Sequence, residues 1–249
     1  MDQKIIELRD LIEKANHIVF FGGAGVSTES GILDFRSETG LYKLKSKWNK
    51  PYEVMLSHEY FEQETDNFYK FYREFMINTT AKPNYAHEYL ARLEKRKKLT
   101  IITQNIDGLH QMAGSQNVIE LHGSIHRNYC TKCMTMYSLE DILKMDNVPH
   151  CPKCGGLIKP DVVLYDEQLN EMNITKALIA IQEADLMIVA GTSLKVYPAA
   201  GLINYFYGDN IVLINKVHVP VDKKIKLEIN DKVGQVFKEV DELSKGENR

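Results

Sequence analysis

The sequence predicts an α/β protein built on a doubly wound parallel sheet, with a smaller cysteine-bearing module attached. Short apolar runs recur along the chain, and the stretches between them are long enough for crossover helices. The first run ends directly in a glycine-rich turn, which is where doubly wound folds bind phosphate. All four cysteines fall in one segment with too few apolar residues to form a core of its own.

The predicted strands are mostly apolar without clean alternation, as expected where both faces of a parallel sheet are covered. They are His17–Phe21, Leu99–Thr103, Val118–Leu121, Leu186–Ala190 and Ile211–Asn215. A helix is predicted before the first strand from the spacing of Ile5, Leu8, Leu11 and Ile12. A closing helix is predicted from Val233, Val236, Phe237, Val240 and Leu243, followed by a solvated tail from Ser244 to Arg249.

Two regions do not fit this alternation. Residues 40–83 are rich in aromatic and charged side chains with patches of helical period, which predicts a helical insertion. Residues 126–156 contain the cysteines, so metal binding is expected to replace the missing core there. The expected division is a large domain of residues 1–39, 84–125 and 157–249, and a small domain formed by the two insertions.

The cysteines form two matched pairs, Cys130-Thr-Lys-Cys133 and Cys151-Pro-Lys-Cys154. This spacing is typical of a four-thiolate zinc site, which holds structure together and does not catalyse. The alternatives are two disulfides, a redox pair or four unrelated thiols. We expect one structural Zn²⁺ per chain. His126 and His150 flank the cysteines and are expected to be surface residues, because four thiolates complete the ligand set.

Composition argues against several classes of protein. The 44% hydrophobic and 26% charged residues are an ordinary globular balance, which argues against a disordered chain. The first ten residues are charged from the second onward, and no apolar run approaches the length of a membrane span. We therefore expect a cytoplasmic protein without a membrane partner. The net charge of −3 gives no electrostatic reason to expect a nucleic-acid partner.

The glycine-rich turn is Gly22-Gly23-Ala24-Gly25-Val26-Ser27, directly after the first predicted strand. Glycines at this place let backbone N–H groups approach a pyrophosphate. Thr28 stands where the third glycine of the dinucleotide fingerprint belongs, so that fingerprint is incomplete. Alone, the motif is equally compatible with an ordinary turn.

Further motifs follow in order along the chain. They are SGILDFR at residues 30–36, TQNIDGLH at 103–110, ELHG at 120–123, GTS at 191–193 and Ile214-Asn215. Together with the GAGVS turn and the cysteine pairs, this set closely resembles the sirtuin family of NAD-dependent protein deacylases, in its bacterial type. The resemblance spans residues 17 to about 240. It implies a Rossmann-like large domain and a small domain made of a zinc ribbon and a helical insertion. NAD and acyl-lysine would bind between these two domains.

The resemblance also implies an activity. The acetyl group of an acetyl-lysine in a protein or peptide would be transferred to ADP-ribose, releasing nicotinamide and 2′-O-acetyl-ADP-ribose. Two other functions stay open: ADP-ribosyl transfer or NAD hydrolysis, and a non-catalytic module that binds NAD or ADP-ribose. A pure binder needs no base, so a retained histidine at the family's base position favours an enzyme.

Site residues follow from the resemblance by position. Around the NAD phosphates and ribose, and on the loop that closes over them, it places Gly23, Ala24, Gly25, Thr28, Asp34, Phe35 and Arg36. Around the nicotinamide and its ribose it places Gln104, Asn105, Ile106 and Asp107. Along the adenosine half it places Gly191, Thr192, Ser193, Asn215, Lys216 and Val233.

Catalysis is assigned to His122, with Asn105 as a polar anchor beside it. His122 matches the family's base, which deprotonates a ribose hydroxyl, and the pKa of an unperturbed histidine, about 6.5, suits that task. Without the motifs, His122 is more simply a strand-end histidine, and Asn105 and Asp107 are turn formers. The peptide backbone is expected to bind as an added strand. The residues assigned to peptide binding are Val162, Val163, Leu164, Tyr165, Val196 and Tyr197. Without the other motifs, the segment that ends at Tyr165 is equally compatible with a buried strand that binds no ligand.

Three positions depart from the family pattern: Leu33 replaces a proline, Gly22 a threonine, and Asp166 a residue that is often glycine. The acyl pocket is expected to be neutral. A Tyr-x-x-Arg motif receives acidic acyl groups in part of the family, whereas here Tyr69 is followed by Tyr72, and Arg73 lies one position late and about 100° around the helix. Phe68 or Tyr72 is expected to line this pocket, unless these aromatic residues belong only to the core.

Overall fold

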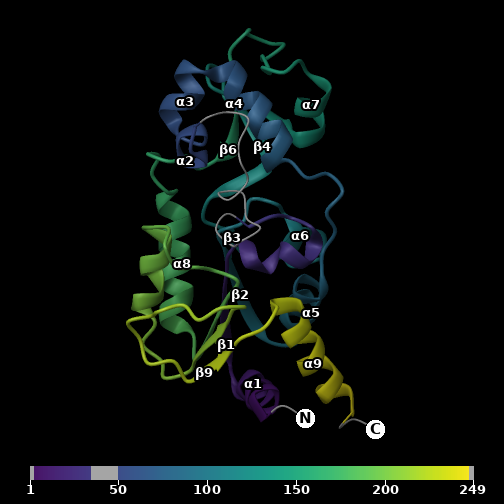
Figure 1. The fold of residues 1–249 in the computed structure, drawn as a ribbon, viewed down its shortest axis with the longest axis vertical. Coiled ribbons are helices and arrows are strands. Elements are labelled where there is room, and N and C mark those ends of the chain that lie inside the picture. The colour runs from purple at the N-terminus through teal and green to yellow at the C-terminus, as the bar shows by residue number, and fades with distance from the viewer. Residues whose placement is uncertain (1–2, 35–49, 247–249) are drawn as a thin grey trace.

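The structure is a computed structural model that describes residues 3–34 and 50–246. A six-stranded parallel sheet occupies the larger part of the molecule, and a three-stranded antiparallel sheet lies with helices α2 to α4 at the other end (Figure 1). Phe35 and Arg36 of the expected cofactor loop lie outside the described residues. Within the described residues, no helix is both long enough and apolar enough to cross a membrane.

The large sheet has the strand order β3-β2-β1-β7-β8-β9, and all its strands are parallel. Their bounds are β1 His17–Gly22, β2 Lys98–Thr103, β3 Val118–Glu120, β7 Leu186–Ala190, β8 Ile211–Ile214 and β9 Leu227–Ile229. Counting only these strands along the chain, the order is 3-2-1-4-5-6, that of a Rossmann fold. The strand order reverses between β1 and β7, the place where such folds bind ligands.

Helices cover both faces of this sheet. On one face lie α1 (Gln3–Lys14), α5 (Tyr85–Glu94) and α9 (Val233–Gly246), and on the other lie α8 (Glu171–Glu183) and the 3₁₀ helix Ala199–Tyr205 (Figure 1). Successive residues of β1 enter opposite cores: Ile18 and Phe20 one, Val19 and Phe21 the other. This double burial explains why the central strands are mostly apolar in sequence without clean alternation.

The ends of two predicted elements differ from expectation. The closing helix runs on to Gly246, so Ser244 lies in its last turn, where its hydroxyl donates to the carbonyl of Val240 at 3.0 Å. A sixth strand, β9, was not predicted, because it has three residues with Glu228 at its centre. The predicted tail therefore begins too early, and residues 247–249 lie outside the described part.

The insertion predicted at residues 40–83 is helical where the structure describes it. It contains α2 (Tyr52–Met55), α3 (His58–Gln63), α4 (Thr65–Phe71) and a π-helical turn, Tyr72–Met76. Their aromatic side chains form a core of their own, and Ile125, Leu139, Val162 and Leu164 pack against it from outside the insertion. Residues 40–49 of the expected insertion lie outside the described residues.

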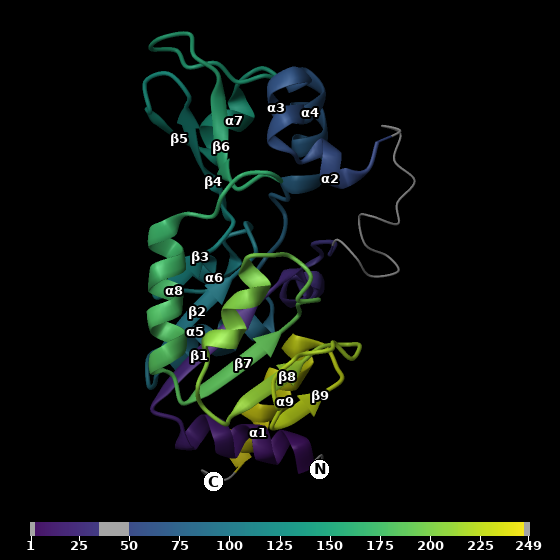
Figure 2. The ribbon, with the colours of Figure 1, turned by 90° about the vertical axis from the view of Figure 1, so that its left-hand side faces the viewer.

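The small sheet has the order β5-β4-β6, with β4 Gly123–Cys130, β5 Met136–Ser138 and β6 Ile158–Val162, and α7 (Leu139–Lys144) follows β5 (Figure 2). The expected division placed β6 in the large domain, whereas it pairs with β4 here. Arg73 joins the helical insertion to the cysteine module: its guanidinium donates to the carbonyls of Ile142 at 2.9 Å and Asp146 at 2.8 Å. Arg73 therefore points toward the cysteine module.

Candidate active site

The motif residues gather at the carboxyl ends of the central strands. Parallel strands end at the same edge of a sheet, so the turns that follow β1, β2 and β7 meet there. The Gln104 N–H donates to the Gly22 carbonyl at 2.9 Å, and the Gly23 N–H donates to the Ala190 carbonyl at 3.1 Å. Three stretches that are far apart in sequence thus form one site.

Glycines let two of these turns touch backbone to backbone. The Gly25 N–H donates to the Gly191 carbonyl at 2.7 Å, and Gly191 has a φ of +59°. A Cβ atom on Gly191 would lie 2.4 Å from the Val26 nitrogen, and one on Gly25 would lie 2.7 Å from the Gly191 Cα. Any side chain at either position would push the turns apart, so glycine at both positions is required for the packing of the two turns.

Ser27 connects the glycine-rich turn to the turn after β2. Its hydroxyl donates to Asp107 Oδ2 at 2.7 Å and accepts from Asn105 Nδ2 at 3.0 Å, while Asp107 Oδ1 accepts the Leu109 N–H at 2.9 Å. Burial raises the pKa of the Asp107 carboxyl, and the hydrogen bonds from Ser27 and Leu109 oppose part of that rise. Ser27 ends the GAGVS motif but was not assigned a role from sequence, although its place in the motif was the available signal.

A second chain of contacts runs through Thr192. Gln104 Nε2 lies 3.1 Å from Thr192 Oγ1, and the Thr192 carbonyl accepts from Asn215 Nδ2 at 3.1 Å. Thr192 and Asn215 are buried, whereas Lys216 is exposed. Val233 is packed in the core under α9, so its side chain belongs to the hydrophobic interior.

His122 lies in the turn between β3 and β4, with its ring against the turn after β2. Its Nδ1 lies 2.9 Å from the Gln104 carbonyl oxygen. Because a carbonyl oxygen can only accept, Nδ1 carries the proton and Nε2 is the basic nitrogen of the neutral ring. Burial lowers the pKa of His122, and the bond to Gln104 opposes part of that shift. The ring is therefore neutral at physiological pH, as a general base requires.

His126 has a contact that the sequence did not predict. As expected, its side chain is exposed and so is that of His150. However, His126 Nε2 also donates to the Asp107 carbonyl at 2.9 Å. Gly108, at a φ of +72°, lies under the ring, and a Cβ atom there would be 2.7 Å from His126 Cδ2. Strand β4 thus contacts the turn that carries Asp107.

The segment expected to bind peptide continues from β6, which is an edge strand among the described residues. The Val163 N–H donates to the His122 carbonyl at 3.0 Å, and Tyr165 exchanges backbone hydrogen bonds with Leu56 at 2.9 Å and His58 at 3.0 Å. Leu164 and Val162 point into the aromatic core, and Tyr197 is exposed. Asp166 has a φ of +71°, so aspartate here takes a conformation that glycine adopts more easily.

The aromatic residues of the helical insertion are core residues. Phe68 and Tyr72 have no exposed surface, and Tyr69 donates its hydroxyl to the Ile158 carbonyl. The expectation that Phe68 or Tyr72 lines an open acyl pocket is therefore wrong for this structure, and the alternative of a purely structural aromatic cluster describes both residues.

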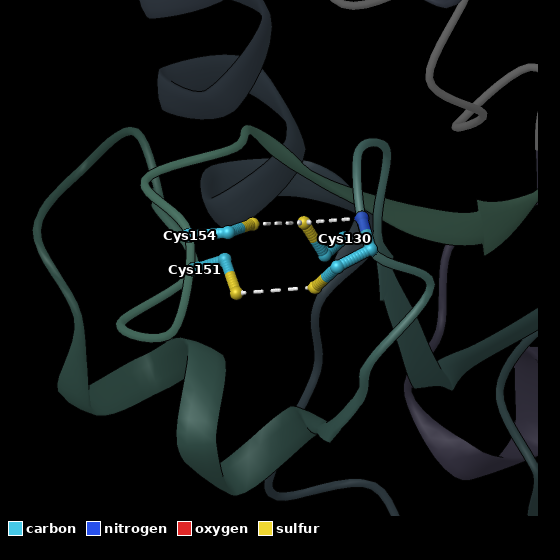
Figure 3. A group of neighbouring side chains, drawn as sticks. Cys130, Cys151 and Cys154 are labelled. Carbon is cyan, nitrogen blue, oxygen red and sulfur yellow. Dashed lines mark hydrogen bonds between the residues drawn. The ribbon is translucent and has the colours of Figure 1, made fainter.

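The four cysteines come together as a candidate metal centre. Cys130 is the last residue of β4 and faces Cys154 on the loop before β6, where Cys151 also lies (Figure 3). Cys133 follows in the turn after β4. The Sγ atoms all lie within 4.8 Å of one another, with Cys130–Cys154 at 3.4 Å and Cys133–Cys151 at 3.6 Å. These separations exceed a disulfide bond of about 2.05 Å. They are close to the edge of a tetrahedron of sulfurs, about 3.8 Å for metal–sulfur distances of about 2.3 Å.

Comparison with known proteins decides the family. The Sir2 family model matches residues 23–198, which is more than half of the chain. The chain belongs to the Sir2 family. An NAD-dependent protein deacetylase of Clostridium acetobutylicum is 56% identical over 239 residues, covering 95% of this chain and 98% of that protein. One from Staphylococcus epidermidis is 46% identical over 237 residues, covering 95% and 96%.

Solved Sir2 structures share the whole fold of this sirtuin. A Sir2 structure with a p53 peptide and NAD⁺ superposes with a TM-score of 0.85 at 38% identity, covering 98% of this chain and 99% of that chain. A Sir2 structure bound to a propionylated peptide has a TM-score of 0.86 at 37% identity, with the same coverage. Both likenesses include the Rossmann-like sheet and the cysteine-bearing end of the molecule.

Proposed function

We infer that this sirtuin is an NAD-dependent protein-lysine deacetylase that transfers the acetyl group of acetyl-lysine to ADP-ribose, releasing nicotinamide and 2′-O-acetyl-ADP-ribose. One observation carries the proposal: Gln104 binds His122 through its carbonyl and Thr192 through its side chain. A neutral histidine with its basic nitrogen available is thereby fixed beside the turns that a dinucleotide would occupy. The relatives named as deacetylases support the same activity.

The residues of the site fit NAD. The backbone-to-backbone contact of Gly25 and Gly191 forms a turn with little side-chain cover, as a pyrophosphate requires. NAD supplies a ribose carbon that becomes electrophilic when nicotinamide leaves. Ser27, Asn105 and Asp107 form the polar wall on the side of the turn after β2, and we assign them the nicotinamide end.

His122 acts as the general base. With Nδ1 held by Gln104, its Nε2 takes the proton of a ribose hydroxyl, which then accepts the acetyl group. Desolvation of the partly buried ring lowers its pKa, which favours the unprotonated form of this nitrogen at neutral pH. Asn105 orients the site through Ser27 and keeps the Asp107 carboxylate facing the glycine-rich turn.

We assign peptide binding to strand addition along the segment after β6, where Val163 is hydrogen-bonded to the backbone of His122. An acetyl-lysine held there would lie close to the base in space, because the Val163 N–H donates to the His122 carbonyl. Tyr197 supplies an exposed ring for the opposite side of the peptide. Sir2 structures with acetylated and propionylated peptides support a peptide substrate.

The four cysteines are proposed to hold one structural Zn²⁺. Four thiolates form a closed ligand set, which gives the metal no open position for catalysis. The metal would fix the end of β4 and the loop before β6. Strand β4 begins directly after His122, and β6 ends directly before Val163. The reducing cytoplasm keeps such thiols free to bind metal, and we propose that compartment for this chain.

Product analysis tests the proposed activity. Wild-type protein, NAD and an acetylated peptide are incubated, and the products are identified by mass spectrometry. Acetyl transfer gives the mass of acetyl-ADP-ribose together with deacetylated peptide. Free ADP-ribose with the peptide still acetylated indicates hydrolysis, and a peptide that gains ADP-ribose indicates ADP-ribosyl transfer.

Acyl selectivity is expected to favour neutral groups. Arg73, which lies one residue after the position of the family's acyl-binding arginine, is bound to carbonyls of the cysteine module. Asp166 adds a negative charge on the peptide-binding segment. We therefore expect acetyl-lysine to be removed at least about tenfold faster than succinyl-lysine, a difference of about 1.4 kcal/mol in activation free energy. Competition kinetics on paired peptides measure this ratio, and equal turnover contradicts the expectation.

A further inference from the structure

The glycine-rich turn is held from outside by a residue with no assigned role. Asn84 lies immediately before α5 and is 58 residues from the turn in sequence. Its Nδ2 donates to the Val26 carbonyl at 2.8 Å and to Ser30 Oγ at 3.0 Å. These two contacts bracket Ser27, the residue that binds Asn105 and Asp107.

The orientation of the Asn84 amide is fixed by its own helix. Its Oδ1 accepts the Ala86 N–H at 3.0 Å, and its backbone N–H donates to His87 Nδ1 at 3.2 Å. His87 is fully buried, and burial lowers its pKa to about 4, so the ring is neutral and Nδ1 can accept. With the amide oxygen committed to the helix, both amide hydrogens are directed at the glycine-rich turn.

A second side chain holds the 3₁₀ turn Thr28–Ser30, which directly follows the glycine-rich turn. Glu29 Oε2 accepts the Gly234 N–H at the start of α9 at 2.7 Å. This contact does not involve Asn84, and neither do the bonds from Gly25 to Gly191 and from Ser27 to Asp107, so the segment stays attached when the Asn84 amide is removed. Loss of the amide is therefore expected to displace Val26 and Ser27 without unfolding the turn.

We propose that Asn84 is a positioning residue for NAD binding: its amide holds Val26 and Ser30 so that the glycine-rich turn stays shaped for the pyrophosphate and Ser27 stays in reach of Asp107. The proposal rests on the assignment of this turn to NAD in the proposed function. Asn84 does not touch the reacting atoms, and its effect reaches the site through the turn alone.

The test uses two variants that retain the helix cap and lose the donors. Asn84→Ser and Asn84→Asp both keep an N-cap oxygen for α5, so thermal stability is expected to stay near that of the wild type. Losing two hydrogen bonds that hold the turn is expected to raise KM for NAD about tenfold, with kcat at saturating NAD changed less than about twofold. Asn84→Asp is expected to show the larger rise, because its carboxylate faces the Val26 carbonyl.

The matched control is Asn170→Ser. Asn170 caps α8 in the same way, by accepting the Asn173 N–H at 3.1 Å, and has no contact with the glycine-rich turn. Its KM for NAD is expected to equal that of the wild type. An unchanged KM in a folded Asn84→Ser protein, or an equal rise in Asn170→Ser, overturns the proposal.

Calorimetry with ADP-ribose separates this proposal from the proposed activity, because binding is measured without turnover. If the wild-type protein binds ADP-ribose but does not deacetylate, the proposed activity is contradicted. The ADP-ribose affinities of the wild type and the Asn84 variants can still be compared. About tenfold weaker binding to both Asn84 variants supports the proposal, and unchanged affinity contradicts it. Binding equally weakened in Asn170→Ser also contradicts it.

Discussion

The His122→Ala variant is expected to lose deacetylation by a factor of about 10² to 10⁴, the contribution of a positioned general base. Its affinity for NAD is expected to stay within about twofold of the wild type, because the ring is bound to the Gln104 carbonyl and not to the glycine-rich turn. The measurements are single-turnover deacetylation and calorimetric titration with NAD. A variant that deacetylates at the wild-type rate would remove His122 from the role of base.

The pH dependence distinguishes loss of a base from general damage. The base must be unprotonated, and burial lowers the pKa of His122 below 6.5. Wild-type activity is therefore expected to hold at neutral pH and to fall as the pH drops through that lowered value. This acidic decline should be absent from the residual activity of His122→Ala. His150→Ala, which truncates an exposed histidine, is the control and is expected to retain the wild-type profile.

Removing the metal centre is expected to have the largest effect on folding. Structural zinc contributes an apparent free energy of about 10–16 kcal/mol in small metal-dependent folds, which equals or exceeds the whole stability of many domains, about 5–15 kcal/mol. In Cys154→Ser, one of the four ligands is lost, so the loop before β6 and the end of β4 are expected to unfold locally. Because β4 begins directly after His122, deacetylation is expected to fall with zinc content.

Elemental analysis and activity are measured on the same samples for this test. Lys153→Ser is the matched control, since it lies in the same turn and is not a thiolate. It is expected to bind one zinc per chain and to retain activity. Full activity of chelator-treated protein after verified zinc loss would show that the metal has no structural role.

The sheet was predictable because of where its strands lie. Both faces of β1, β2, β7 and β8 are covered, so these strands are mostly apolar and distinct from helices in the sequence. Strand β9 lies at the edge and carries Glu228 between two buried residues, so it lacks that pattern. The aromatic period at Phe68, Phe71 and Tyr72 predicted a helix correctly, but periodicity cannot tell a core from a pocket.

Only the part of the candidate site that lies within recognisable motifs was predictable from the sequence. The turns after β1, β2 and β7 carry recognisable motifs, and the parallel sheet explains why they meet. Ser27 and Asp107 are 80 residues apart, and Asn84 and Val26 are 58 apart, so no local spacing relates them. The contact of His126 with Asp107 likewise depends on how β4 lies against the turn after β2. Such contacts become visible only in the folded chain.

Nicotinamide release with and without an acetylated peptide tests the central claim most directly. A deacetylase whose peptide segment lies beside His122 is expected to release nicotinamide only when the acetylated peptide is present, with one nicotinamide per acetyl group removed. Equal release without the peptide would identify an NAD hydrolase, and no release under either condition would leave only a binding module. Either of those results would contradict the account.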